Sequence, residues 1–272
     1  VRYIQVWNEP NLQNEWAGEP VNPVRYAALL KVAAERARAA NPDVVVLAAS
    51  LAPNVEAGPK LGYANLSDLL FLQGLYDAHA APYFDVVVAN PYGLQHGPYD
   101  DRSIGPRAYQ FPRAFVRPPQ SFDFARPIAL HQVMERNGDR LKPIWAGEFG
   151  WTTVPADWSG NPSPWSSVTA QEQATYTVQA YERALQEWPW MGVMNLWYLR
   201  EPVDVDPRDP TPYFAILHQD WTPTPAYDRV RALATQAPRD YTGSHPATTG
   251  AARYGFAGAW RSEPSSDGAL TY

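Results

Sequence analysis

The sequence contains no cysteine, so it can form neither disulfide bonds nor thiolate metal sites. It has no apolar run of the ~20 residues that a membrane-spanning helix needs, and we expect no membrane partner. The five histidines show no spacing typical of metal ligands. We therefore expect no metal and no other cofactor.

Basic residues are also scarce. There are 22 Lys and Arg against 28 Asp and Glu, a net charge of −6, and no basic stripe is present. A chain of this balance is not expected to bind nucleic acid or an anionic surface. Hydrophobic residues make up 45% of the 272 residues, which is enough for the core of one large domain.

Several well-known catalytic motifs are missing. The sequence has no G-x-S-x-G nucleophile elbow, no P-loop and no H-E-x-x-H zinc motif. No G-x-G-x-x-G follows any expected strand, which removes the main support for a dinucleotide-binding fold. Serine-hydrolase, nucleotide-hydrolase, zinc-peptidase and dehydrogenase chemistry are all disfavoured.

Aromatic residues, by contrast, are plentiful, with 11 Trp and 16 Tyr. An aromatic ring can stack on the flat apolar face of a sugar, or it can simply pack in a core. Composition alone does not choose between these two roles for any single ring.

Short apolar runs alternate with patterns typical of amphipathic helices. We expect strands at residues 1–7, 44–49, 84–89, 143–148 and 192–198, and helices at residues 23–40, 66–78, 127–136, 169–187 and 225–235. Strands that are apolar on both faces and followed by helices indicate a parallel sheet covered by helices. The prediction is an α/β fold, a partial (β/α)8 TIM-type barrel of five βα units.

The chain divides into two expected regions. Residues 1–237 form the partial barrel, and residues 238–272 form a linker and a short β tail. That tail is either the start of an accessory β module or an edge strand that returns to the barrel. Residues 90–126 form a long, aromatic-rich connection, which we expect to be a functional loop beside the site.

Two glutamates stand at the ends of expected strands. Glu9 lies in YIQVWNEPN and Glu148 lies in PIWAGEFGW, three strand steps later. The carboxyl ends of barrel strands form the active-site face, so the two carboxylates should face each other there. Cleavage of a glycosidic bond uses such a pair, one as an acid and the other as a carboxylate on the opposite side.

The flanking residues of both glutamates resemble a known superfamily. Trp7-Asn8-Glu9-Pro10 is similar to the strand-four motif of clan A glycoside hydrolases, and Glu148-Phe149-Gly150 is similar to their strand-seven motif. Among the families of this clan, the sequence most resembles families 39 and 5. The resemblance implies barrel strands four to eight, with Glu9 as acid/base and Glu148 as nucleophile.

The resemblance also implies residues that contact substrate. Asn8 is similar to the asparagine that contacts the sugar 2-hydroxyl, and Tyr92 to the tyrosine that hydrogen-bonds the nucleophile. Asn90-Pro91-Tyr92 stands where His-x-Tyr is common. The expected substrate-binding residues, which include two tryptophans in loops of the active-site face, are Asn8, Trp16, Asn90, Tyr92, Trp151 and Trp197.

The function implied is hydrolysis of a β-linked glycan with retention of configuration. The alternative is a non-catalytic half-barrel that binds carbohydrate or serves in assembly. Strands one to three of the resemblance are absent, so we expect a second copy of the chain or a complementing N-terminal half as a further partner. The sequence begins at Val1 inside an apolar run, and we expect a secreted bacterial protein whose N-terminus is missing here.

Overall fold

The computed structural model describes residues 1–100, 123–236, 263–264 and 270–271. Its main sheet has five parallel strands in the order β1-β2-β3-β4-β5. The strands are Tyr3–Gln5 (β1), Val45–Leu51 (β2), Val86–Ala89 (β3), Ile144–Phe149 (β4) and Met191–Leu196 (β5). The helices that follow them in turn are Pro23–Ala40 (α1), Asp68–Asp77 (α2), Arg126–Arg136 (α3), Ala170–Glu187 (α4) and Pro225–Ala234 (α5).

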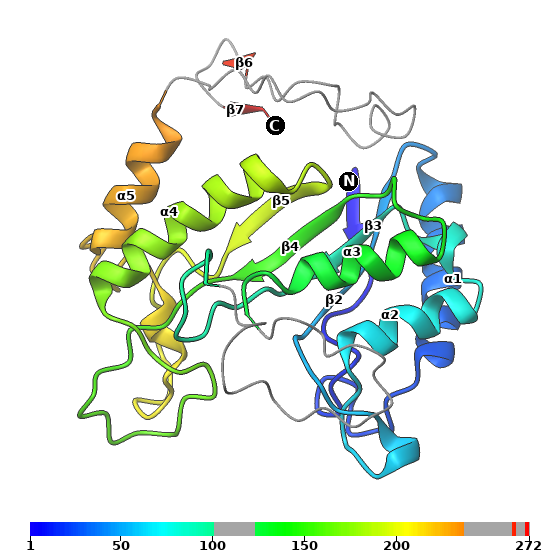
Figure 1. Cartoon of the computed structure of the whole chain (residues 1–272), viewed down its shortest axis with the longest axis horizontal. Coiled ribbons are helices and arrows are strands. Elements are labelled where there is room, and N and C mark those ends of the chain that lie inside the picture. Colours follow the sequence, from blue (N-terminus) through cyan, green and yellow to red (C-terminus); the bar gives the residue numbers. More distant parts are fainter. Residues whose placement is uncertain (101–122, 237–262, 265–269, 272) are drawn as a thin grey trace.

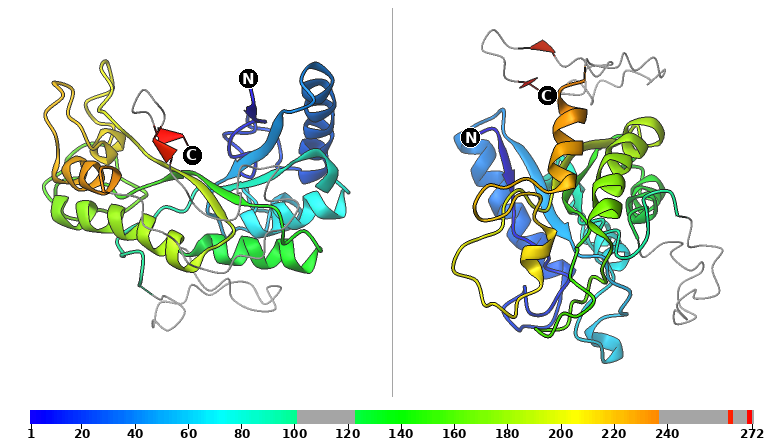
Figure 2. Two further views of the ribbon diagram at one scale, coloured as in Figure 1. Left: turned by 90° about the horizontal axis from the view of Figure 1, so that it is seen from above. Right: turned by 90° about the vertical axis from the view of Figure 1, so that its left-hand side faces the viewer.

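The sheet curls, and the helices cover its convex side (Figure 1, Figure 2). Each strand pairs with the next one in sequence, without the reversal of strand order that marks a doubly wound sheet. This arrangement confirms the partial (β/α)8-type barrel that the sequence predicted. Among the described residues, short 3-10 helices occur at Pro59–Leu61, Ala81–Tyr83 and Thr211–Phe214.

Helix boundaries follow local signals in the sequence. Asn22 caps α1, where its side-chain oxygen accepts hydrogen bonds from Val24 N and Arg25 N. Thr169 and Glu172 form a reciprocal capping box at the start of α4. Both helices therefore begin within one residue of the predicted position.

The first strand is much shorter than predicted. We expected residues 1–7, but β1 covers only Tyr3–Gln5. It pairs with β2 alone, and Trp7 adopts a positive φ of 75°, which is incompatible with a regular strand. The chain therefore leaves the strand just before the motif that contains Glu9.

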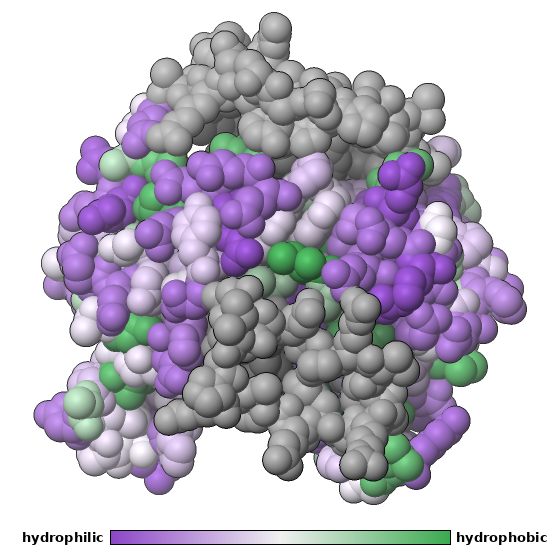
Figure 3. Space-filling view, viewed as in Figure 1, coloured by the Kyte–Doolittle hydropathy of each residue, from purple (hydrophilic) through white to green (hydrophobic). Residues whose placement is uncertain are grey.

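The main core lies between the sheet and its helices. Tyr26 of α1 shows how the layers are joined, since its hydroxyl donates to Val6 O at 2.8 Å and accepts from Ala49 N at 2.6 Å. The outer surface over α3 and α4 is mostly hydrophilic, with scattered apolar residues (Figure 3). In the described part of the chain, no helix combines the length and apolarity that crossing a bilayer requires.

A second, smaller cluster consists of side chains on β2 and β3. Val45, Leu47, Val86 and Val88 pack together, with the indole of Trp145 against them. A half-barrel is expected to leave an apolar opening that something must cover, because a complete barrel has eight strands. None of these four side chains is more than 5% exposed in the structure. That a second copy of the chain or another segment covers the opening stays a prediction.

The edges of the main sheet are nevertheless open within the described residues. β1 pairs only with β2, and β5 pairs only with β4. The tail strands β6 (Glu263–Pro264) and β7 (Leu270–Thr271) pair with each other in a separate antiparallel sheet. Most of the linker and tail expected at residues 238–272, and residues 101–122 of the loop expected at 90–126, lie outside the described residues.

Open strand edges predict association. Unpaired N–H and C=O groups along an edge strand recruit further strands, so we expect the purified 30.4 kDa chain to form a dimer. Light scattering across a dilution series measures the mass directly. A species that keeps the monomer mass at every concentration would contradict this prediction.

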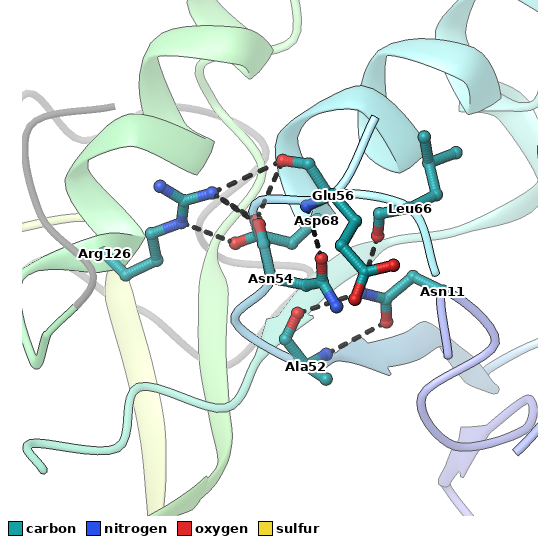
Figure 4. A network of polar contacts seen from close by, with 8 residues as sticks. Asn11, Ala52, Asn54, Glu56, Leu66, Asp68 and Arg126 are labelled. Carbon is teal, nitrogen blue, oxygen red and sulfur yellow. Dashed lines mark hydrogen bonds and ion pairs between the residues drawn. The ribbon is translucent and has the colours of Figure 1, made fainter. Parts of the chain in front are cut away.

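A buried ion pair joins the connection between β2 and α2 to the start of α3 (Figure 4). The Arg126 guanidinium donates to both carboxylate oxygens of Asp68, with Nε to Oδ2 at 2.8 Å, and Nη2 also reaches Asn54 O at 3.2 Å. Arg126 is 1% exposed and Asp68 is fully buried. This contact holds a long connection in place at the edge of the sheet where the strands end.

Candidate active site

Glu9 sits on a sharply turned segment that follows β1. Its φ of 44° lies in the left-handed region that non-glycine residues seldom adopt. The turn is held by backbone hydrogen bonds, from Glu9 N to Ser50 O and from Leu12 N to Glu9 O, both 2.9 Å. Strain of this kind persists only where neighbouring contacts enforce it, and it occurs most often at functional sites.

The side chain of Asn11 fixes the same segment to its neighbours. Its side chain is fully buried and makes a two-way contact with Ala52, donating to Ala52 O at 2.9 Å and accepting from Ala52 N at 3.0 Å. It also donates to Leu66 O at 3.1 Å (Figure 4). The chain just after Glu9 is therefore fixed to the residues that follow β2.

The end of β3 contacts both glutamates. Asn90 is 1% exposed, and its Nδ2 donates to Glu9 Oε1 at 2.6 Å. Two residues later the Tyr92 hydroxyl donates to Glu148 Oε2, also at 2.6 Å. A single tripeptide, Asn90-Pro91-Tyr92, thus gives each carboxylate one hydrogen bond. The replacement of His by Asn at the first position leaves Tyr92 directed at Glu148.

Glu148 lies on β4, directly after a glycine that the packing requires. A Cβ added at Gly147 would lie 2.9 Å from Asn90 Oδ1, 2.8 Å from a Val88 methyl carbon and 3.1 Å from Ser50 Cβ. Any larger residue would push against β2 and β3 together. The absence of a side chain at Gly147 therefore leaves room for the Asn90 side chain, which contacts Glu9.

The ring of Tyr92 is held by other aromatic side chains. Its centroid lies 5.5 Å from that of Phe214 and 6.4 Å from that of Trp165, and the residue is 8% exposed. Burial and the charges of Glu148 and Glu9 raise the pKa of the Tyr92 hydroxyl well above its ordinary value. The hydroxyl therefore stays protonated and remains a donor to Glu148.

The two glutamates have different ionisation. Burial, which has the largest effect, and the charges of Glu148 and Glu15 together raise the pKa of Glu9 to about 7, although the hydrogen bond from Asn90 lowers it. Burial also raises the pKa of Glu148, while the Tyr92 hydrogen bond lowers it. Because the charge of Glu148 already acts on Glu9, Glu9 is the last of the pair to lose its proton. Just below neutral pH the arrangement is one acid and one carboxylate.

Replacing Asn90 by Ala should change the pH dependence of any reaction that needs protonated Glu9. The substitution removes the hydrogen bond that lowers the pKa of Glu9, so that pKa should rise. The basic limb of the kcat/KM profile should then move to higher pH. Stopped assays of xylobiose or cellobiose hydrolysis across pH 5 to 9 measure this, because a poor leaving group depends on the proton of Glu9.

Asn41→Ala is a matched control, since Asn41 ends α1 and contacts Val1 O. Its profile should superimpose on that of the unaltered protein. An Asn90→Ala profile with an unmoved basic limb would contradict the assignment of this hydrogen bond to Glu9.

Asn8 and Trp197 both lie beyond the carboxyl ends of strands, Asn8 after β1 and Trp197 after β5. Asn8 is half-buried and its Oδ1 accepts from Ser50 Oγ at 2.5 Å, while Ser50 also receives a hydrogen bond from Gln5 Nε2 at 3.2 Å. Trp197 directly follows β5 and is half-buried, with its backbone N donating to Phe149 O at 2.8 Å. Whether either residue contacts sugar stays a prediction.

Two predicted sugar-contacting tryptophans belong to the core. Trp151 is 1% exposed, its ring packs against Phe124 and Phe149, and its indole N–H donates to His96 O at 2.8 Å. Trp16 is 8% exposed and packs edge-on against Tyr26. Because both rings are buried, the structure gives no support to the predicted sugar contacts of Trp16 and Trp151, which stay predictions.

Sequence reasoning also missed two residues near Glu9. Trp7 is 50% exposed, and the exposed Glu15 carries a charge that raises the pKa of both Glu9 and Glu148. Trp7 belongs to the motif that carried the resemblance, but a sequence motif does not show whether a side chain is exposed to solvent. Among the described residues there is no cluster of three or more His, Asp or Glu side chains suited to a metal ion.

Comparisons with known proteins identify the fold. The sequence matches no protein-family model and no curated protein at a significant level. Solved structures do match. A family 39 glycoside hydrolase from Bacteroides cellulosilyticus WH2 has a TM-score of 0.56 at 20% identity, over 85% of this chain and 40% of its own.

Two further structures give the same result. The GH39 enzyme from Xanthomonas axonopodis pv. citri has a TM-score of 0.57 at 17% identity, over 88% of this chain and 41% of its own. A monomeric beta-xylosidase from Caulobacter crescentus CB15 has a TM-score of 0.53 at 16% identity, over 87% and 42%. This chain therefore spans about two fifths of the length of these proteins and has part of their barrel fold.

Proposed function

We propose that this chain carries the catalytic carboxylate pair of a retaining β-glycoside hydrolase, with Glu148 as nucleophile and Glu9 as acid/base. The observation that supports it best is the hydrogen bonding from the end of β3, where Asn90 and Tyr92 each donate to one carboxylate at 2.6 Å. Donors aimed at two carboxylates from the strand between them fix the orientation of both. The fold shared with family 39 structures adds support.

In the first step the ionised Glu148 carboxylate attacks the anomeric carbon. Glu9 gives its proton to the leaving oxygen, and a covalent glycosyl ester forms on Glu148. Charge is lost from Glu148 as the ester forms, and the Tyr92 hydroxyl stays within reach of the carboxyl group throughout. Burial of both carboxyl groups strengthens these interactions, because little water screens them.

In the second step the roles of Glu9 reverse. It has lost its proton and now acts as a base that removes a proton from water, which attacks the anomeric carbon and breaks the ester. A pKa of about 7 suits a group that must be both acid and base near neutral pH. Two displacements return the sugar with its original configuration.

The alternative is a half-barrel that binds glycans without cleaving them. Binding needs neither a protonated Glu9 nor a donor on Glu148, whereas the half-buried pair provides both. The observation that favours the alternative is that the chain spans only about two fifths of the length of the similar structures.

The test is hydrolysis of 4-nitrophenyl β-D-xylopyranoside and β-D-glucopyranoside, followed by proton NMR. The proposal expects the β-anomer to be the first sugar product. First release of the α-anomer would overturn the retaining mechanism. No hydrolysis of either compound, together with measurable binding of xylobiose or cellobiose by calorimetry, would favour the binding half-barrel.

A further inference from the structure

One tryptophan close in sequence to Glu9 is exposed to solvent rather than buried in the core. Trp7 stands two residues before Glu9 and is 50% exposed. Its indole N–H donates to Glu15 O at 3.0 Å, and the edge of its ring meets Trp16 at a centroid distance of 5.6 Å. Its backbone oxygen accepts from Gln5 Nε2 at 3.0 Å. The ring is thus fixed at its polar edge and on one side, and half of its surface meets solvent.

The loop that carries Glu15 is also well fixed. Trp16 N donates to Leu12 O at 3.1 Å, and Gln13 N donates to the Asn65 side chain at 3.0 Å. The Glu15 side chain itself is exposed, and its Oε1 accepts from Asn14 Nδ2 at 3.0 Å. A carboxylate with free acceptor capacity therefore projects from a rigid loop whose backbone holds the indole of Trp7.

The charge of Glu15 reaches the catalytic pair. It raises the pKa of Glu9 and also that of Glu148, so the three carboxylates lie close enough to repel one another. Repulsion between like charges at this distance costs stability in the absence of a ligand. A sugar hydroxyl that donates to Glu15 would relieve part of it.

The exposure of Trp7 differs from that of the other displayed tryptophan. Trp221 is 62% exposed, but the Arg200 guanidinium lies 4.3 Å from the centroid of its ring. Among the described residues no cationic side chain lies over Trp7. A large apolar face left open next to polar groups is the usual form of a carbohydrate-stacking surface.

We propose that Trp7 and Glu15 form the subsite that holds a sugar on the leaving-group side of the cleaved bond. The inference rests on the proposed function, in which Glu9 protonates the leaving oxygen, so groups on the strand end and loop of Glu9 lie beside the departing sugar. Trp7 stacks on the apolar ring face, and Glu15 accepts hydroxyl hydrogen bonds. Because three carboxyl groups lie close together, the subsite should bind an uncharged sugar. The carboxylate of a uronic acid would be repelled.

The test separates leaving groups that are sugars from one that is not. Trp7→Ala and Glu15→Gln should each lower kcat/KM on xylobiose or cellobiose by about tenfold, the size of losing one stacking contact or one hydrogen bond to a charged group. On β-D-xylosyl fluoride and β-D-glucosyl fluoride, whose leaving group is a single fluoride ion, both variants should stay within about twofold, because no ring fills the subsite. Trp221→Ala is the matched control and should leave both reactions unchanged.

Other outcomes overturn the proposal. Equal losses on disaccharide and glycosyl fluoride would place Trp7 and Glu15 in a general structural role. A Trp7→Ala variant with normal disaccharide turnover and an altered mass in light scattering would assign Trp7 to an interface between copies.

If the unaltered chain cleaves none of these compounds, the proposed function fails separately, and binding of xylobiose and cellobiose decides the subsite. Calorimetry should then show weaker binding for Trp7→Ala and Glu15→Gln than for Trp221→Ala. Equal binding by all three would sink the subsite as well.

Discussion

Replacing Glu148 by Gln should abolish hydrolysis of both activated and unactivated β-glycosides, with a fall in kcat of several orders of magnitude. The amide cannot form the glycosyl ester, and a good leaving group does not help because attack on the anomeric carbon is itself lost. Gln keeps the size of the side chain and can still accept from the Tyr92 hydroxyl, so folding should be unaffected.

Replacing Glu9 by Gln should give a different pattern. The variant cannot protonate the leaving oxygen, so natural glycosides with poor leaving groups should react several orders of magnitude more slowly. Aryl glycosides need little protonation, and their first step should be partly preserved. The measured quantity is the ratio of kcat on 4-nitrophenyl glycoside to kcat on disaccharide, for Glu9→Gln and Glu148→Gln side by side.

Glu35→Gln is a suitable control, since Glu35 lies on the exposed side of α1 in a loose 3.9 Å pair with Lys31. It should match the unaltered chain on every substrate. Near-normal aryl glycoside hydrolysis by Glu148→Gln would show that the nucleophile is assigned wrongly. A Glu9→Gln variant that loses both substrates to the same extent would show the same for the acid.

Breaking the buried pair of Arg126 and Asp68 should destabilise the fold by about 3–5 kcal/mol for either partner alone. Arg126→Leu leaves an uncompensated carboxylate in a site where Asp68 is fully buried. Asp68→Leu leaves the guanidinium without its bidentate partner. Removing both charges should cost less than the sum of the single changes, because the double variant buries no lone charge.

Urea unfolding followed by circular dichroism measures these free energies. Glu35→Gln again gives the comparison, because an exposed pair contributes little and its unfolding midpoint should stay at that of the unaltered chain. A single Arg126 or Asp68 substitution with a midpoint equally unchanged would show that the ion pair does not hold the connection after β2. The additive sum of both single effects in the double variant would show that the two side chains act independently.

Local sequence signals determined the elements of this fold. Apolar runs such as residues 44–49 become strands buried on both faces, and caps such as Asn22 and Thr169 set where helices begin. These effects depend on residues within a few positions of one another, so they can be predicted from the sequence alone. The motifs around Glu9 and Glu148 predicted both residues at strand ends; Glu148 lies near the end of β4, whereas Glu9 follows β1 on a turned segment.

Only the tertiary structure decided which side chains meet and which face solvent. Asn90 contacts Glu9 across 81 residues of sequence, and that contact exists only because β3 follows β2 and β1 in the sheet. Trp151 and Trp7 are both tryptophans just beyond strand ends, yet one is 1% exposed and the other 50%. Exposure is set by how distant segments pack over a ring, and the ionisation of Glu9 depends on the same packing.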